Sequence, residues 1–185
     1  MKVIVGCEFS QIVTQAFRNR GHEAFSCDLL PTEGNPQWHF KEDVFEVLKR
    51  ESFYLGIFHP PCTHLSVSGA RWFAEKRADG RQQEGIDFFM RLVEAPIEKI
   101  AIENPVGIMS TIYRKPDQII QPYWFGDPYQ KATCLWLNGL PKLQPTNIVE
   151  GKEQKCWKEP PSLDRWKNRS RTYKGFAEAM ATQWS

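Results

Sequence analysis

Four short apolar runs constrain the fold of this chain more than any other feature of its sequence. They cover residues 3–5, 23–28, 54–58 and 99–103, and each one ends at a glycine, an acid or a proline-containing turn. Their length and their content of β-branched and aromatic residues are typical of buried strands. Because the strands of a parallel sheet are buried on both faces, such continuous runs favour a mostly parallel sheet.

Helical patterns lie between these runs. Ser10 is a candidate N-cap, residues 11–20 then place apolar side chains at helical spacing, and Gly21 is suited to end that helix. Residues 83–95 form a second amphipathic pattern, which Pro96 stops. The order of strand, turn, helix and strand ending in an acid is typical of a nucleotide-binding domain. The predicted fold class is therefore α/β and Rossmann-like, with a mostly parallel central sheet.

The second half of the chain has a weaker pattern. Residues 107–127 are expected to be irregular, residues 131–137 return to strand character, and residues 176–184 are expected to form a short helix with one apolar side. A chain of 185 residues is long enough to close one core. Residues 1–185 are therefore predicted to form a single domain.

Composition excludes several classes of protein. Basic residues exceed acidic residues by only two, so the net charge gives no argument for nucleic acid. The five cysteines, at positions 7, 27, 62, 134 and 156, form no CxxC pair, which argues against a disulfide framework or a zinc site. The first apolar run is too short for a signal peptide, and none approaches membrane-spanning length. We expect a cytoplasmic protein without metal or membrane association.

One cysteine follows a predicted strand directly. After residues 54–58 come His59, Pro60 and Pro61, and the two prolines stop strand pairing because neither has an N–H group. Cys62 therefore lies on a stiff turn at the carboxyl end of a strand, the edge where open α/β sheets bind ligands. An isolated cysteine is more often a small buried apolar residue, so the position alone leaves both interpretations open.

Four segments together resemble a known family. The run from Pro61-Cys62 to Gly69 resembles the Pro-Cys nucleophile loop of the DNA cytosine-5 methyltransferases, and Ile102-Glu103-Asn104 resembles their second catalytic segment. Residues 7–11 (CEFSQ) and 175–180 (GFAEAM) have counterparts in the short phage- and prophage-type members of that family. The resemblance spans nearly the whole chain. A phage-encoded member would act in the cytoplasm of its host cell.

The resemblance implies two catalytic residues. Cys62 would add as a thiolate to carbon-6 of cytosine, which makes carbon-5 nucleophilic enough to take a methyl group. Glu103 would donate a hydrogen bond to ring N3, which requires a protonated or proton-sharing carboxyl; burial at a strand end favours the proton. His59 and His64 flank the cysteine, and each is either a proton acceptor or ordinary polar surface.

The resemblance also implies S-adenosylmethionine as the cofactor. The turn of Gly6, Cys7, Glu8, Phe9, Ser10 and Gln11 would face its methionine part, Asp28 its ribose and Asp43 its adenine, with Val44, His59 and Pro60 completing the site. The turn has no GxGxxG pattern, which argues against NAD and is acceptable for a cofactor without pyrophosphate. Asp28 is otherwise a turn residue, and Asp43 is otherwise the N-cap of a helical turn over residues 44–49.

The substrate contacts are less well defined. The larger family members carry Gln-x-Arg-x-Arg, whereas residues 130–134 read QKATC, so a contact to cytosine O2 must come from Lys131, Arg169 or Arg171, or be absent. The implied substrate-binding residues are Pro61, Ser66, Asn104, Lys131, Arg169 and Arg171. Asn104 would orient the Glu103 carboxyl or contact the exocyclic amine; alternatively it caps the turn before Pro105.

A short basic segment stands where larger family members have a target-recognition domain. Within this insert, residues 143–174, the part from 152 to 174 holds eight basic residues against three acidic ones, interleaved with aromatic residues. Residues 69–80 have a similar mixture on an expected loop, as suits contact with unstacked bases; alternatively, they form a packed surface helix with solvated charges. The expected partner is DNA or a cytidine nucleotide such as dCMP, with a second copy or an accessory subunit as a further source of recognition. The alternatives are a non-catalytic nucleic-acid-binding module and a thiol hydrolase using Cys62.

Overall fold

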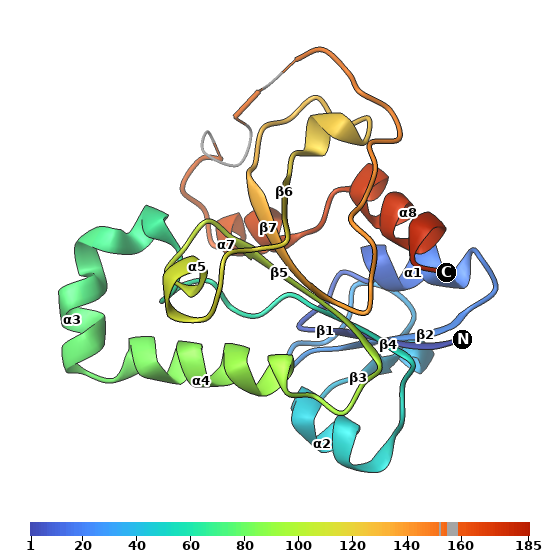
Figure 1. The fold of residues 1–185 in the computed structure, drawn as a ribbon, viewed down its shortest axis with the longest axis horizontal. Helices are drawn as coiled ribbons and strands as arrows, with labels where there is room; N and C mark the ends of the chain where they lie inside the picture. Colours follow the sequence, from blue (N-terminus) through green and yellow to red (C-terminus); the bar gives the residue numbers. More distant parts are fainter. Residues whose placement is uncertain (152, 155–158) are drawn as a thin grey trace.

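A seven-stranded sheet forms the centre of the molecule (Figure 1). The computed structural model describes residues 1–151, 153–154 and 159–185. The strands in those ranges are β1 (Lys2–Gly6), β2 (Glu23–Cys27), β3 (His39–Phe40), β4 (Leu55–Phe58), β5 (Lys99–Pro105), β6 (Gln118–Ile120) and β7 (Thr133–Asn138). Their order across the sheet is β3-β2-β1-β4-β5-β7-β6.

The strand directions confirm the predicted α/β fold class. β1, β2, β3, β4 and β5 pair in parallel, and β7 runs antiparallel to both β5 and β6. The carboxyl ends of β1, β2, β4 and β5 therefore meet at one edge of the sheet. β7 begins at the same edge, because its first residue, Thr133, lies opposite Pro105 at the end of β5. Every predicted catalytic residue lies at this edge or in a loop that leaves it.

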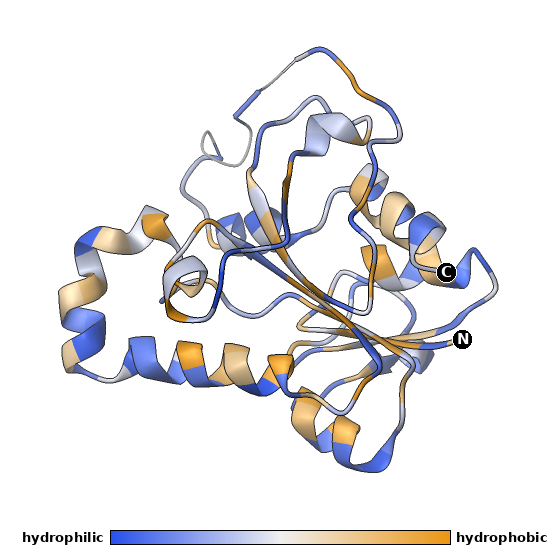
Figure 2. Ribbon diagram, viewed as in Figure 1, coloured by the Kyte–Doolittle hydropathy of each residue, from blue (hydrophilic) through white to orange (hydrophobic). Residues whose placement is uncertain are grey.

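Helices cover both faces of the sheet (Figure 1). Those in the described part of the chain are α1 (Ile12–Arg18), α2 (Val44–Arg50), α3 (Phe73–Ala78), α4 (Arg81–Val93), α5 (Met109–Ile112), α7 (Arg165–Ser170) and α8 (Lys174–Gln183). The short 3₁₀ turns of the same part are η1 (Pro36–Trp38), η2 (Val67–Trp72) and η3 (Pro122–Trp124). Figure 2 shows that the strands are mostly hydrophobic, whereas the helices carry both hydrophobic and hydrophilic residues, as expected of helices that bury one side.

The alternation of side chains along the strands produces two cores. Val3 and Val5 of β1 pack on the face covered by α1 and α8, whereas Ile4 packs on the face covered by α2 and α4. Phe89 of α4 is fully buried in the second core, next to Trp136 of β7. This division explains why the strand runs are apolar at most positions rather than at every second one.

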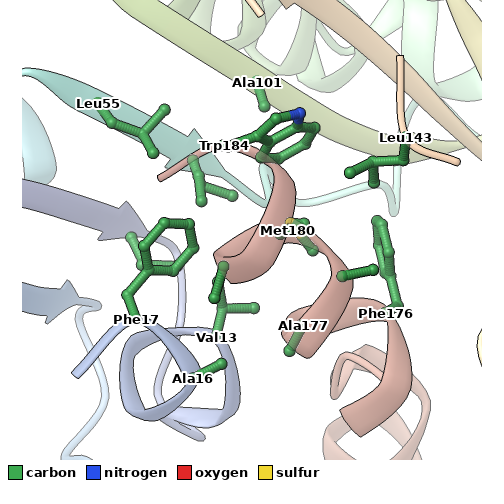
Figure 3. Packing of buried hydrophobic residues seen from close by; sticks show 14 of the residues in the cluster. Val13, Ala16, Phe17, Leu55, Ala101, Leu143, Phe176, Ala177, Met180 and Trp184 are labelled. Atoms are coloured by element: carbon green, nitrogen blue, oxygen red, sulfur yellow. The ribbon is translucent and has the colours of Figure 1, made fainter. Parts of the chain in front are cut away.

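The C-terminal helix closes the first core. Phe176, Met180 and Trp184 are buried along one side of the helix, as its pattern predicts. Figure 3 shows Val13 and Phe17 of α1 on the side of Met180 and Ala177 of α8, and Trp184 beside Ala101 of β5. The two ends of the chain are thereby joined through α1 and α8, which lie side by side.

Three local predictions were wrong. Ser10 does not cap α1 as a conventional N-cap: Gln11 holds the cap position with φ 58°, and the Glu8 carboxylate accepts from the first N–H groups instead. Residues 69–80 form η2 and α3 rather than the expected loop, which agrees with the alternative interpretation of this segment as a surface helix. Residues 107–127 contain α5, η3 and β6, because pairing with β7 gives residues 118–120 strand geometry that their own pattern does not demand.

Part of the basic insert lies outside the described residues. The predicted basic and aromatic segment has five of its residues there: Lys152, Lys155, Cys156, Trp157 and Lys158. Within the described ranges, no helix combines the length and apolar character needed to cross a membrane.

Candidate functional site

The cysteine loop begins where β4 ends. The N–H of His59 donates to the Gly6 carbonyl (3.0 Å), which ties the start of the loop to the neighbouring end of β1. The Cys62 carbonyl then accepts from the N–H groups of Leu65 (3.0 Å) and Ser66 (2.9 Å), so the loop turns tightly around the cysteine. The Cys62 side chain is half-buried at this edge of the sheet, as predicted for a turn after a strand.

Buried polar side chains fasten the cysteine loop from three elements. Asn104, 2 % exposed, donates from Nδ2 to the Pro60 carbonyl (2.8 Å). Lys76 of α3, 7 % exposed, donates from Nζ to the Thr63 carbonyl (2.6 Å), and Gln82 of α4 donates from Nε2 to the His64 carbonyl (3.2 Å). These contacts satisfy carbonyl groups that strand pairing leaves without partners after β4.

The loop is also backed by the chain that follows β5. The N–H of Ile108 donates to the Leu65 carbonyl (3.0 Å), and the N–H of Val67 donates to the Val106 carbonyl (3.1 Å). Gly107 lies between them, and a Cβ atom at this position would be 2.4 Å from the Leu65 carbonyl oxygen. The close approach of the two backbones therefore requires glycine.

Glu103 pairs with His59 at this edge. The two side chains come from the ends of β5 and β4, with Glu103 Oε2 2.6 Å from His59 Nδ1, and they are 13 % and 12 % exposed. Burial would raise the pKa of Glu103, but the hydrogen bond and charge of His59, together with the charge of Lys131, outweigh burial and hold that pKa below its ordinary value. Burial alone therefore does not give a protonated carboxyl; Glu103 is the proton-sharing partner of His59.

Charges of both signs act on Cys62. Burial raises the pKa of its thiol, the Glu103 carboxylate raises it further, and the positive charges of Lys131 and Arg169 lower it without cancelling the shift. The thiol is therefore protonated at neutral pH in the ligand-free protein. The mutual electrostatic effects show that the cysteine, the acid and the two cations share one region, and Lys131 Nζ donates to the Arg169 carbonyl (3.2 Å).

Two depressions adjoin this region. A small pocket is lined by Glu103, Lys131, Thr172 and Tyr173, among others, and a wider groove of about 520 Å³ is lined by Arg169, Thr172 and Tyr173, among others. The shared residues Thr172 and Tyr173 make the two depressions neighbours. Both depressions therefore lie beside the C-terminal segment, and the small one adjoins the acid.

The turn after β1 has an unusual backbone. Cys7 and Gln11 have φ of 60° and 58°, in the left-handed region that non-glycine residues rarely adopt. The buried Glu8 carboxylate accepts from the N–H groups of Val13 (2.7 Å) and Thr14 (3.2 Å) and from the Thr14 hydroxyl (2.6 Å). Burial raises the pKa of Glu8. These side-chain contacts bind Glu8 to α1, so any contact of this turn with a cofactor would come from its backbone and its other residues.

The remaining predicted cofactor residues differ in exposure. The buried Gln11 side chain bridges to the backbone of Asn35 in both directions (2.7 and 2.9 Å). Asp28 is half-buried at the end of β2, where burial raises its pKa. Asp43 is exposed and caps α2 by accepting from the Phe45 N–H (2.8 Å), as the alternative interpretation expected.

Other predicted residues of this group lie deeper or nearer the strand ends. The Val44 side chain is buried, and a Cβ atom on Gly6 would lie 3.1 Å from Val44 Cγ2 and 2.6 Å from the Phe58 ring. Pro60 is buried, whereas Pro61 is exposed. Burial raises the pKa of the Cys7 thiol, and the Asp28 carboxylate raises it further, which places Cys7 beside that acid. The contacts of these residues with a cofactor remain predictions.

The C-terminal segment lies over the turn after β1. Arg171 forms a two-pronged ion pair with Glu33 (2.6 and 3.1 Å), and its guanidinium lies 5.7 Å from the Phe9 ring centroid. The Trp166 and Phe9 ring centroids are 6.2 Å apart. Arg171, predicted to contact the substrate, therefore holds the C-terminal segment against this turn, whereas Arg169 lies near Cys62.

Two further loop residues have mainly structural contacts. The buried Ser66 caps η2, with its hydroxyl accepting from the Ser68 N–H (3.4 Å). Burial and the charges of Lys76 and Arg81 lower the pKa of His64, which is therefore neutral at neutral pH.

The sequence predicted which residues come to this edge of the sheet, but not the side chains that hold the cysteine loop in place. Cys62, Glu103, His59, Lys131 and Arg169 share one region, whereas Asp43 and Arg171 lie elsewhere on the same edge. Lys76 and Gln82 hold the cysteine loop, but the sequence indicated only that they are polar residues in an amphipathic pattern. Within the described ranges, no group of three His, Cys, Asp or Glu side chains is arranged to hold a metal ion.

Comparisons with known proteins give the fold. No protein-family model matches the chain, and no curated protein matches it significantly. Among solved structures, the chain is similar to a protein described as a candidate DNA modification methyltransferase encoded within a prophage (E. coli), with 15% identity and a TM-score of 0.55. The match covers 88% of this chain and 56% of that one, so this chain spans little more than half the length of its neighbour. The mostly parallel seven-stranded sheet is thus a Rossmann-like fold of the methyltransferase type.

Proposed function

We propose that this chain is an S-adenosylmethionine-dependent methyltransferase that acts on carbon-5 of cytosine in DNA, with Cys62 as the nucleophile and Glu103 at ring N3. The proposal is supported by the pairing of β4 with β5: the loop after β4 holds Cys62, the end of β5 holds Glu103, and the two residues are 41 positions apart in the sequence. The Glu103 charge acts on the Cys62 thiol, and the Lys131 charge acts on both groups. The methyltransferase-type fold and the description of its structural neighbour support the reaction class.

The neighbouring strand ends offer suitable groups for the cofactor. Asp28 places a half-buried carboxylate at the end of β2, where a ribose hydroxyl can donate to it, and the exposed Asp43 carboxylate lies after β3. The turn from Gly6 to Gln11 wraps closely around the end of β1 because of its two left-handed residues. These two carboxylates and this turn fit S-adenosylmethionine, which supplies an electrophilic methyl group when bound.

The chain's own residues have separate tasks in the reaction. As a cytosine enters, the half-buried Cys62 thiol gives its proton to solvent water and its sulfur forms a bond to carbon-6, for which Lys131 and Arg169 provide positive charge. The electron density pushed onto the ring is stabilised when N3 receives a proton at the Glu103 carboxyl. Lys131 is the residue nearest in character to the missing arginines and is assigned to the O2 side of the base.

The second half of the reaction restores the ring. After carbon-5 has gained its methyl group, it loses its hydrogen as a proton to a base, and the electron pair that is freed expels the Cys62 sulfur from carbon-6. N3 returns its proton at the same time. The protein is regenerated, and the net change in the substrate is replacement of one hydrogen by methyl.

A free cytidine nucleotide is the second candidate substrate. The pocket beside Glu103 is small and is closed on one side by Thr172 and Tyr173, and the described residues contain no separate target-recognition domain. The pocket itself is about the size of a water molecule, about 10 Å³, so only the lack of such a domain within the described residues favours a free nucleotide over a base taken out of a strand. The groove that joins the pocket, with Arg169 and Arg171 in its lining, favours a polymer with a phosphate backbone.

Transfer of a labelled methyl group tests the proposal. The protein is incubated with methyl-labelled S-adenosylmethionine and, in parallel, single-stranded DNA, double-stranded DNA or dCMP, and the product bases are separated. We expect label in 5-methylcytosine from at least one substrate and none with Cys62→Ala. Cys134→Ala is the matched control, because burial raises the pKa of Cys134 to about 11 and keeps that thiol inert.

Three outcomes would contradict the proposal. Cofactor binding, measured by calorimetry, without transfer to any of the three substrates would favour the non-catalytic nucleic-acid-binding module. Undiminished transfer by Cys62→Ala would exclude the covalent route. Label in dCMP alone would replace DNA by the nucleotide as the substrate.

A further inference from the structure

His59 is placed to act on Glu103 rather than on Cys62. Its Nδ1 atom is 2.6 Å from Glu103 Oε2, and both side chains are almost entirely buried. Its other ring nitrogen, Nε2, is also buried and has no hydrogen-bond partner among the described residues. His64 Nδ1 is likewise buried without a partner, so it is the contact with Glu103 that distinguishes His59.

The charged groups around His59 come from three parts of the edge. The Glu8 carboxylate faces it from the turn after β1, Glu103 from β5, and the Lys131 ammonium from the chain before β7. Glu8 is already engaged by α1, so Glu103 is the carboxylate that is free to exchange a proton with the imidazole. Both acids favour the imidazolium form.

We propose that His59 and Glu103 hold one shared proton and that His59 supplies the proton which Glu103 presents to ring N3 of the cytosine. This inference rests on the proposed function. As the sulfur of Cys62 bonds to carbon-6, N3 takes a proton from the Glu103 carboxyl, and Glu103 takes the proton from Nδ1 of His59. The products of this step are a protonated N3, a Glu103 carboxylate that accepts a hydrogen bond from N3, and a neutral imidazole whose remaining proton is on Nε2.

This arrangement assigns His59 a positioning and proton-supplying role. An imidazolium carries protons on both nitrogens, so it cannot also accept the proton of the Cys62 thiol. The pKa values agree with the geometry: although burial lowers the pKa of His59, the hydrogen bond and charge of Glu103 and the charge of Glu8 outweigh it and raise that pKa above its ordinary value. The pair therefore keeps its proton at neutral pH and loses it as pH rises through the raised pKa of His59.

A titration followed by nuclear magnetic resonance tests the shared proton without any substrate. The probe is the protein with ¹⁵N-labelled histidine, whose four histidines are assigned by single substitutions. We expect the His59 resonances to report an imidazolium above the pH at which an ordinary histidine loses its proton, near 6.5. Glu103→Gln removes the carboxylate and should move the titration of His59 to lower pH. A neutral His59 at pH 6.5, or a titration that Glu103→Gln leaves unchanged, would overturn the proposal.

Covalent trapping tests the use of that proton. The probe is single-stranded DNA with 5-fluorocytosine, in the presence of S-adenosylmethionine, and the adduct is detected as a slower band on a denaturing gel. His59→Asn keeps an N–H donor near the position of Nδ1 but cannot hold the proton. We expect adduct formation to slow by about 10²-fold, as is common when a proton donor is lost. We also expect a change in the pH at which the rate of adduct formation begins to fall on the alkaline side. His22→Asn, at the opposite edge of the sheet, should leave both unchanged.

The two experiments separate the inference from the proposed function. If wild-type protein forms the adduct and His59→Asn forms it at the same rate with the same pH profile, His59 only orients Glu103, and the proton transfer is excluded while the methyltransferase proposal stands. If wild-type protein forms no adduct and methylates no cytosine, the proposed function fails and the inference fails with it, whatever the titration shows.

Discussion

The cysteine loop, residues 59–66, and the C-terminal segment, residues 159–173, both lie at the same edge of the sheet but are held in different ways. Buried groups hold the loop: Asn104 bonds to the carbonyl of Pro60 and Lys76 to that of Thr63. The segment is held by the ion pair of Arg171 with Glu33, whose side chains are 31% and 42% exposed. The loop is thus built into the core, and the segment rests on the surface.

The difference matches the two demands of the proposed reaction. A thiol that must attack carbon-6 has to be held close to the required geometry, because a misplacement of about 1 Å can cost about 10²-fold in rate. A segment beside the substrate groove instead has to admit and release a polymer, and regions with few buried contacts open at low free energy. We therefore expect changes in the loop to reduce stability and catalysis together, and changes in the segment to alter substrate binding alone.

The largest effect is expected from Gly107→Ala. The added Cβ atom would be 2.4 Å from the Leu65 carbonyl oxygen, a backbone atom that can move only if the cysteine loop moves with it. We expect a loss of about 3 kcal/mol in the free energy of unfolding, at the upper end for overpacking, and a fall in kcat of about 10²-fold. Urea unfolding and the methyl-transfer assay measure the two effects.

Gly69→Ala is the matched control for this substitution. It lies in the same part of the chain, but its Cβ atom would be 3.4 Å from Lys76 Nζ, the end of a flexible side chain, and 3.7 Å from the Thr63 carbonyl oxygen. We expect a change in stability of less than about 1 kcal/mol. Equal effects of the two substitutions would show that the close contact with Leu65 does not fix the loop.

Asn104→Ala is expected to have the next largest effect. It removes the only side chain seen to donate to the Pro60 carbonyl among the described residues and leaves that buried oxygen without its partner. We expect a loss of about 2 kcal/mol, within the usual cost of an unsatisfied buried group, and a lower kcat. Asn19→Ala removes an exposed hydrogen bond to Gln15 and should cost far less. A normal kcat of the Asn104→Ala protein would show that the contact between Asn104 and Pro60 is not needed for catalysis.

The parallel part of the sheet could be predicted from sequence, whereas the antiparallel part could not. The runs that became β1, β2, β4 and β5 are apolar at nearly every position, because both faces of these strands are covered. Residues 118–120 lack such a run, since β6 lies at the edge of the sheet and obtains its strand geometry from pairing with β7. Local pattern predicts an element well only where local burial determines it.

The candidate site divides in the same way. Cys62 and Glu103 follow apolar runs, so the rule that parallel strands end at one edge was enough to place them together. The hydrogen bond between Glu103 and His59 could not be predicted from the sequence, because it joins residues 44 positions apart and depends on the direction of both side chains. The same holds for Glu8, whose role at the start of α1 depends on the left-handed backbone of Gln11.

The smallest effect on stability, and the sharpest test of the comparison, is expected from Arg171→Ala. Its ion pair with Glu33 is partly exposed, so solvent screens it, and its loss should cost less than about 1 kcal/mol. Because the pair holds the C-terminal segment beside the groove, we expect KM for DNA to change severalfold while kcat stays constant.

Glu33→Gln should act in the same direction, and the double variant should add little to either one, because both substitutions break one contact. Measurement of kcat and KM at two salt concentrations separates this effect from loss of a phosphate contact, which would change the salt dependence in Arg171→Ala but not in Glu33→Gln. If Arg171→Ala instead lowered kcat and stability as much as Gly107→Ala, the segment would be part of the rigid framework, and the contrast between a fixed nucleophile and an adjustable entrance would be wrong.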